Sequence, residues 1–125
     1  MKVVIQRVNE AKVIIDGQII GKINKGLLIL VGFEETDNEI DIKWIVNKVL
    51  SLRIFNDLDQ KMNLSLSDIN ADLLVVSQFT LHASTKKGNR PSFIKAAPPA
   101  QAHDLYNKTI RHFNENFNGK IETGK

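Results

Sequence analysis

Apolar and polar residues alternate along the first part of the chain. In KVVIQRV, every second side chain would face the same side, which is the period of a β-strand. Two runs rich in β-branched residues follow, and they flank Asp16-Gly17. Both positions of this dipeptide tolerate positive φ, so it is the strongest short signal for a tight hairpin. The pattern predicts a strand over 2–8 and a hairpin over 11–23.

Two later segments are apolar without alternation. GLLILVGF is short and continuously apolar, which is typical of a strand that is covered on both faces. ADLLVVSQFTL begins in the same way and predicts a central strand, but it becomes polar at Ser77 without a turn signal. If the strand continues, the side chains of Gln78 and Thr80 emerge on one face and those of Ser77 and Phe79 on the other.

Helical spacing marks two further segments. Thr36 and Glu39 have the separation of a capping box, in which each side chain satisfies a free backbone amide. Five apolar residues then recur at helical spacing: Ile42, Ile45, Val46, Val49 and Leu52. A second helix begins near Pro98-Pro99, where a missing amide does no harm, and stops at Gly119. It turns five residues inward: Ala102, Leu105, Thr109, Phe113 and Phe117.

Turn-forming residues separate these elements. Residues 53–66 and 82–93 are interrupted by Gly, Pro, Asn and Asp, which indicates loops. Nothing repeats, and no shift in composition marks a linker. We therefore expect residues 1–125 to form one α/β domain, with a mixed β-sheet or β-barrel-like core and two main α-helices.

Composition and motifs exclude several kinds of chemistry. The absence of cysteine excludes disulfides, thiolate catalysis and cysteine-based zinc sites, and is compatible with a reducing cytoplasm. No apolar run reaches the roughly 18 residues of a membrane span, and no secretion signal is apparent. The sequence contains no nucleophile elbow, no phosphate loop and no metal-ligand set, so we expect no metal and no cofactor.

The three histidines carry little signal. His103 and His112 are predicted to be surface residues of the second helix. His82 follows the polar patch, and two interpretations stay open: contact with a substrate, or a solvated loop histidine.

Basic residues gather directly after the polar patch. Between Asp72 and Asp104 there is no acidic residue, while four basic residues fall there: Lys86, Lys87, Arg90 and Lys95. Alone, such a cluster is typical of a solvated loop. Beside Ser77–Thr80, it predicts a positive field that suits phosphate oxygens. The residues by themselves indicate a polar, amide-rich pocket for an anionic or carbonyl-bearing ligand.

Four stretches together resemble the D-aminoacyl-tRNA deacylase family. These are VVSQFTL, the downstream KKGNRPSF, the N-terminal VIQRV and RIFND…KMNLS between them, and the likeness runs along essentially the whole chain. The resemblance implies an esterase that releases a D-amino acid from the terminal adenosine of tRNA, as chiral proofreading in translation. It also implies cleavage of glycine mischarged on tRNA-Ala. Such enzymes are cytoplasmic homodimers without metal, whose partner is aminoacyl-tRNA rather than DNA or a membrane.

The resemblance also assigns residues. It implies that Ser77, Gln78, Phe79 and Thr80 line the aminoacyl pocket as the catalytic segment. Arg7 matches an arginine that supports the family's second motif, and Phe93 matches a residue near the terminal nucleotide. The further candidates for substrate binding lie in the same loop as Phe93: Lys86, Lys87, Arg90 and Ser92.

The chemistry of ester hydrolysis fits this patch. Attack on the carbonyl builds negative charge on oxygen, and backbone amides around Phe79 are candidates to stabilise it. Thr80 could attack directly, but no base lies close in sequence. The alternative is assistance by the 2′-hydroxyl of the terminal ribose, with the protein supplying placement. We favour the second route.

One signature of the family is absent from this sequence. Asn-x-Gly-Pro-x-Thr, whose cis Gly-Pro enters the other subunit's pocket and rejects L-amino acids, has no counterpart, because no Gly-Pro dipeptide occurs. Either this segment and the family's C-terminal strands follow Lys125 in a longer chain, which we favour, or the chain is a truncated relative. Exposed strand edges would otherwise remain, so dimerisation is predicted on this ground as well.

Two alternative functions compete with the esterase. The first is a non-catalytic RNA-binding module, which the aromatic content of 6% disfavours because such modules stack bases on exposed rings. The second is an editing module like that of archaeal threonyl-tRNA synthetases, which the Ser-Gln-Phe-Thr motif disfavours.

Overall fold

A four-stranded mixed sheet forms the centre of the computed structural model, which describes residues 1–124. Its strand order is β1-β4-β7-β8, with β1 antiparallel to β4 and the other neighbours parallel. The bounds are β1 Lys2–Val8, β4 Gly26–Gly32, β7 Asp72–Ser77 and β8 Ile121–Thr123. The α/β class and the central position of β7 are confirmed.

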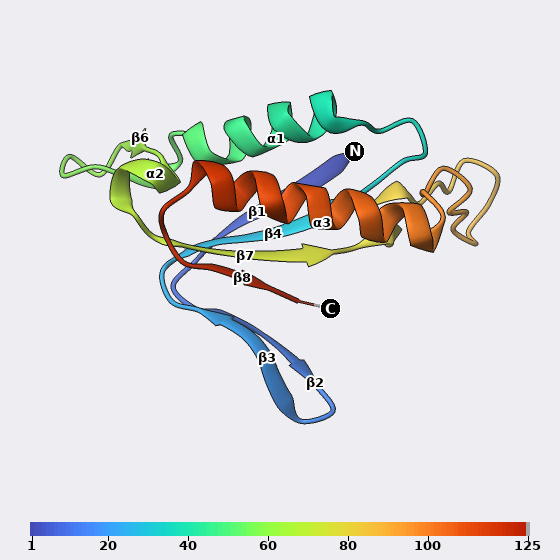
Figure 1. Cartoon of the computed structure of the whole chain (residues 1–125), viewed down its shortest axis with the longest axis horizontal. Coiled ribbons are helices and arrows are strands. Elements are labelled where there is room, and N and C mark those ends of the chain that lie inside the picture. Colours follow the sequence, from blue (N-terminus) through green and yellow to red (C-terminus); the bar gives the residue numbers. More distant parts are fainter. Residues whose placement is uncertain (125) are drawn as a thin grey trace.

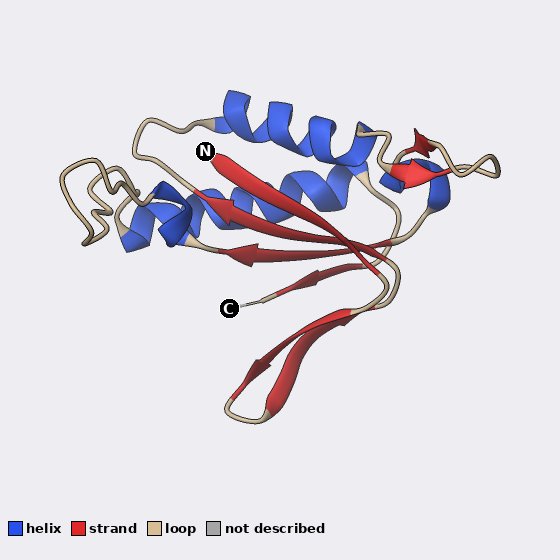
Figure 2. Cartoon of the chain, turned by 180° about the vertical axis from the view of Figure 1, so that it is seen from behind, coloured by secondary structure: helices blue, strands red, loops and turns tan. Residues whose placement is uncertain are grey.

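Two helices cover one face of this sheet (Figures 1 and 2). They are α1 Glu39–Ser51, which follows β4, and α3 Pro99–Asn116, which precedes β8. Each connects parallel strands, as crossover helices do. Neither they nor any shorter helix of residues 1–124 is long and apolar enough to span a membrane.

A β-hairpin projects on the side of the sheet opposite the two helices (Figure 1). Its strands are β2 Ala11–Ile15 and β3 Gln18–Ile23, and Asp16 and Gly17 turn between them with φ of 51° and 78°. The predicted hairpin is therefore confirmed. Small elements β5 Phe55–Asn56, β6 Met62–Leu64 and α2 Leu66–Ile69 complete the turn-rich segment after α1, and η1, a 3₁₀ helix over Phe79–His82, follows β7.

One hydrophobic core lies between the sheet and the helices. Alternate residues of β4 and β7 enter it, and α1 and α3 supply the other half. Its most deeply buried side chains include Leu27, Ile29, Val31, Leu73, Val75, Ile42, Val46, Val49 and Phe113. The helical spacing read from the sequence thus identifies the inward faces of both helices, although two of the predicted positions, Leu52 and Phe117, are C-caps outside them.

The helix ends differ from the predictions. Asn38, not Thr36, caps α1: its side chain accepts from the amides of Ile40 and Asp41, and the Asp41 carboxylate accepts from the Asn38 amide. Gly119 does not stop α3, which ends at Asn116. The next residue, Phe117, has an extended backbone and is buried, at 6% exposure.

The core is an open sheet rather than a closed barrel in the described part of the chain, because β1 and β8 are its two edges. The face opposite the helices is only partly covered. Val4 is 48% exposed there, and its register neighbours Leu30 and Val76 are half-buried.

Candidate functional site

The polar patch after β7 is a turn and not a continued strand. Gln78 is still extended, and its amide donates to the Val31 carbonyl oxygen at 2.7 Å. The chain then winds into η1, contrary to the predicted strand. Gly32 makes room for this turn, since a Cβ there would lie 2.8 Å from the Gln78 carbonyl oxygen and 3.1 Å from Cδ2 of His82.

The turn still separates the four polar-patch residues into the two predicted pairs. Ser77 and Phe79 line a cleft, whereas the Gln78 side-chain amide donates to the Thr80 hydroxyl. The alternation of a strand predicted these two pairs, although the segment is a 3₁₀ turn and not a strand. The side chains of Gln78 and Thr80 thus restrain each other beside the cleft.

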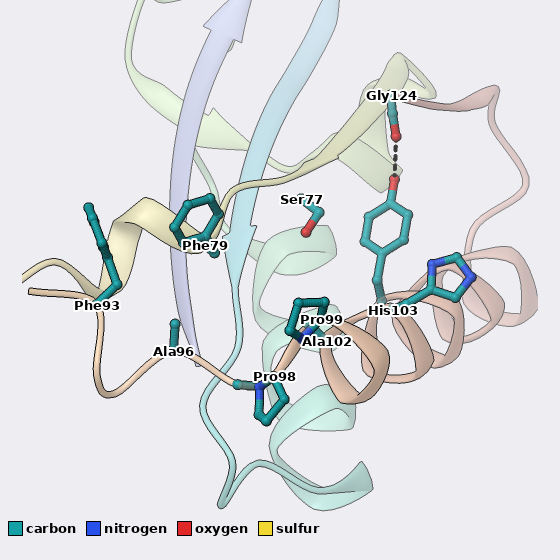
Figure 3. A pocket seen from close by; sticks show the side chains of 11 residues that line it. Ser77, Phe79, Phe93, Ala96, Pro98, Pro99, Ala102, His103 and Gly124 are labelled. Atoms are coloured by element: carbon teal, nitrogen blue, oxygen red, sulfur yellow. Dashed lines mark hydrogen bonds between the residues drawn. The ribbon is translucent and has the colours of Figure 1, made fainter.

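The cleft has a volume of about 720 Å³ and lies between the β7–η1 junction and the start of α3 (Figure 3). Its floor and walls are mostly apolar, with a few polar groups from Ser77, His103 and Tyr106. The lining residues are Ser77, Phe79, Phe93, Ala96, Ala97, Pro98, Pro99, Ala102, His103, Tyr106 and Gly124. A concave, largely apolar site with few polar groups is the usual form of a small-ligand site.

Two phenylalanines from distant parts of the sequence meet at this cleft. The rings of Phe79 and Phe93 are T-shaped, with centroids 5.2 Å apart and planes at 70°. They are 56% and 37% exposed. Exposed ring faces beside a cleft are suitable for stacking on a nucleobase.

The basic loop, residues 83–95, borders the same cleft. It closes on itself through two 2.8 Å backbone hydrogen bonds between Ser84 and Ser92. Its basic side chains are exposed, and no carboxylate of residues 1–124 forms an ion pair with them: Lys86, Lys87, Arg90 and Lys95. The positive field expected from the sequence is therefore free to act on a ligand.

Two backbone amides at the turn have no hydrogen-bond acceptor among residues 1–124. Phe79 and Thr80 open η1, and the Gln78 side chain does not cap them. Among residues 1–124, no backbone or side-chain oxygen accepts from either N–H group. Free amides at the start of a helical turn are preorganised donors for an oxygen that carries negative charge.

The histidines differ from the sequence predictions. His82 is 3% exposed, with Nδ1 3.2 Å from the Glu34 carboxylate, so the solvated-loop interpretation is wrong. It does not line the cleft. His112 is also buried, at 7% exposure, beside Glu39. His103 is exposed, as predicted, but it lies in the cleft wall.

Arg7 lies away from this cleft. Its guanidinium donates to the Ile54 carbonyl oxygen at 2.9 Å. In register, Arg7 pairs with Leu27 of β4, whereas Ser77 pairs with Val31 near the other end of that strand. The structure thus brings Ser77, Phe79 and Phe93 together and leaves Arg7 apart.

Tyr106 is a cleft residue that the sequence interpretation missed. Its hydroxyl donates to the Val75 carbonyl oxygen at 2.6 Å, and burial raises the pKa of Tyr106 to about 12. The nearest sequence signal is its place one residue after the inward-facing Leu105.

No cluster of three or more metal-ligating side chains occurs within residues 1–124.

Comparisons with known proteins show which family this chain resembles. The family model of D-Tyr-tRNA(Tyr) deacylase matches residues 4–125. A D-aminoacyl-tRNA deacylase of Flavobacterium psychrophilum is 55% identical over 99% of this chain and 83% of its own, and that of Akkermansia muciniphila is 51% identical over 100% and 83%.

Solved structures show the same fold. The c-Myc DNA unwinding element binding protein matches with a TM-score of 0.95 and 36% identity, over 100% of this chain and 85% of its own. A probable eukaryotic D-amino acid tRNA deacylase matches with a TM-score of 0.81 and 14% identity, over 98% of this chain and 87% of its own. At this identity the match shows a shared fold alone. From the family model and the identities of its relatives, this chain belongs to the D-Tyr-tRNA(Tyr) deacylase family.

Proposed function

We propose that this chain hydrolyses the ester bond of D-aminoacyl-tRNA and so releases the free D-amino acid and tRNA. The observation that carries the proposal is the turn at the cleft, where two free amides, from Phe79 and Thr80, adjoin an aromatic pair in a member of this family. The cleft takes the acylated terminal adenosine, and the basic loop takes the phosphates that precede it.

The reaction places a negative charge where the turn has donors. A water molecule attacks the ester carbonyl and gives up a proton, the carbonyl oxygen becomes an oxyanion, and the bond to the ribose oxygen breaks as that oxygen takes a proton. The amides of Phe79 and Thr80 stabilise the oxyanion. Loss of one such donor typically costs about a hundredfold or more in rate.

The environment of Thr80 supports the substrate-assisted route. Its hydroxyl accepts a hydrogen bond from the Gln78 amide, and no described histidine or carboxylate lies in hydrogen-bond contact to remove its proton. The terminal 2′-hydroxyl therefore assists the attack, while Thr80 holds Gln78. Thr80→Ala should retain most of kcat, whereas a substrate without the 2′-hydroxyl should react far more slowly. Loss of turnover in Thr80→Ala with normal substrate binding would favour threonine as the nucleophile.

A deacylation assay tests the function itself. D-tyrosyl-, glycyl- and L-seryl-tRNA are compared under one set of conditions. Release of D-tyrosine from D-tyrosyl-tRNA is expected, and so is release of glycine that is mischarged on tRNA-Ala. Binding without hydrolysis would favour the RNA-binding module, and release of L-serine would favour the editing module.

A homodimer is part of the same proposal. The half-covered face of the sheet carries exposed Val4, and the hairpin adds exposed Ile14, Ile19 and Ile20. In a two-fold dimer, these exposed apolar side chains would be buried against a second copy of the chain. Val4→Arg is expected to lower the sedimentation coefficient to that of a monomer. Ile40→Arg, on the exposed face of α1, is the matched control and should change nothing. A monomeric wild-type chain at micromolar concentration would contradict the dimer.

The remaining expectations complete the proposal. One domain spans residues 1–125, the protein acts in the cytoplasm, and neither DNA nor a metal takes part. Arg7 supports the family's second motif, as its match to the family implies, from the end of the sheet opposite the cleft of its own chain.

A further inference from the structure

The Tyr106 hydroxyl joins three segments at the base of the cleft. It donates to the carbonyl oxygen of Val75 at 2.6 Å. It also lies 3.3 Å from the carbonyl oxygen of Gly124, the contact that is dashed in Figure 3. The Gly124 amide donates to the same Val75 oxygen at 3.1 Å. Helix α3, strand β7 and the residue after β8 are therefore connected at one point.

This point lies between the two walls of the cleft. Pro98, Pro99 and Ala102 of the first wall come from the start of α3, and Ser77 and Phe79 of the second come from the end of β7. Within residues 1–124, the other side-chain hydrogen bonds of α3 do not reach β7. Two stay inside the helix, one reaches the Glu35 carbonyl oxygen before α1, and one reaches Glu39, the first residue of α1. Tyr106 is thus the one side chain of the described helix that is hydrogen-bonded to β7.

The second wall depends on where Val75 sits. Ser77 follows Val75 by two residues, and the free amides of Phe79 and Thr80 come directly after. A displacement of Val75 relative to α3 would move these donors relative to everything bound against Pro98–Ala102. Misplacement by about 1 Å can cost an enzyme about a hundredfold in rate.

We propose that Tyr106 is a positioning residue for deacylation: its hydroxyl sets the distance between α3 and the Ser77–Thr80 turn. The inference rests on the proposed function and adds a residue to it. Tyr106 acts through Val75 and does not itself exchange a proton with the substrate. The phenol proton is already donated to a backbone carbonyl, and burial raises the pKa of Tyr106 to about 12, so it stays in place at neutral pH.

Tyr106→Phe tests this role because it keeps the ring and removes only the tether. Thr109→Val is the matched control: the buried Thr109 hydroxyl donates to the Leu105 carbonyl oxygen at 2.8 Å in the same helix, away from the cleft. Both variants lose one hydroxyl–carbonyl hydrogen bond. Steady-state deacylation of D-tyrosyl-tRNA is measured from pH 6 to 9, well below the melting temperature of each variant.

Tyr106→Phe is expected to lower kcat by about tenfold to a hundredfold, with a smaller change in KM and the same shape of pH profile as the wild type. Thr109→Val should keep the wild-type kcat. Equal activity of Tyr106→Phe and the wild type would overturn the inference, as would an equal loss in Thr109→Val. Loss of one limb of the pH profile in Tyr106→Phe would instead make Tyr106 an acid or base.

Hydrogen exchange gives a second readout that does not require activity. Tyr106→Phe should speed exchange at the Gln78 and Gly124 amides, and Thr109→Val should not. Unchanged exchange at both amides would overturn the inference. An inactive wild-type chain would overturn the proposed function, and this role with it, whereas an active wild type with an equally active Tyr106→Phe would overturn only the role of Tyr106.

Discussion

Gly32 and Gln78 are in backbone contact at the point where strand β4 ends and the turn of the candidate site begins. A Cβ on Gly32 would lie 2.8 Å from the Gln78 carbonyl oxygen, closer than such atoms approach one another. Because the carbonyl belongs to backbone, it cannot move without moving the turn. The geometry of the site therefore depends on a residue that does not line the cleft.

Gly32→Ala is expected to displace η1 and lower kcat by about tenfold or more, since the amides of Phe79 and Thr80 move with it. Gly26→Ala is the control at the other end of β4, where a Cβ would clash with the Asp72 backbone far from the turn. It should lower stability but leave the rate per folded molecule unchanged. Equal specific activity in the folded fractions of both variants would contradict this account of Gly32.

The Phe79–Phe93 pair is expected to bind substrate rather than stabilise the fold. Both rings are more than a third exposed, so either change to alanine should reduce the free energy of unfolding only slightly. Loss of base stacking should raise KM by roughly fivefold to 150-fold, from about 1–3 kcal/mol per base. Steady-state kinetics of both single variants and the double variant measure this, and an additive double variant would show that the rings act independently.

The basic loop is expected to contribute a salt-dependent part of tRNA binding. Replacement of Lys86, Lys87 and Arg90 by alanine should weaken binding of all tRNAs alike. It should also reduce the slope of log K against log salt by about one for each phosphate that the loop no longer neutralises. Replacement of the exposed Lys12 and Lys22 of the hairpin by alanine is the control. A salt slope that changes only in this control variant would place the tRNA on the other side of the molecule.

Tyr106 should make stability depend on alkaline pH. Burial raises its pKa from 10.0 to about 12, so the folded chain holds the phenol proton more tightly than the unfolded chain. This contribution is complete below pH 10 and is lost as the pH rises to about 12. The difference in unfolding free energy between wild type and Tyr106→Phe, measured by denaturant titration, should shrink over that interval. A constant difference would mean that Tyr106 titrates normally.

Local patterns were sufficient for most elements of the fold. The Asp16-Gly17 hairpin, the apolar run of β4 and the inward faces of α1 and α3 all follow from residues within a few positions of one another. The cap of α1 was missed because Asn38–Asp41 and Thr36–Glu39 have the same spacing, and a spacing alone does not choose between them.

The site depended on contacts that no local pattern contains. Strand propensity predicted continuation past Ser77, but the space above Gly32 and the burial of His82 favour the turn. Tyr106 follows a core residue on an amphipathic helix, and only the tertiary structure shows that its hydroxyl reaches β7. Phe79 and Phe93 were proposed from a family likeness, and their ring contact is a property of the folded chain.

A crystal structure with a non-hydrolysable amide analogue of 3′-D-tyrosyl-adenosine tests the central claim most directly. We predict that the analogue occupies the cleft between Phe79 and Pro99, with its carbonyl oxygen within hydrogen-bond distance of the Phe79 or Thr80 amide. An analogue bound elsewhere, or bound there with its carbonyl turned away from both amides, would contradict this claim.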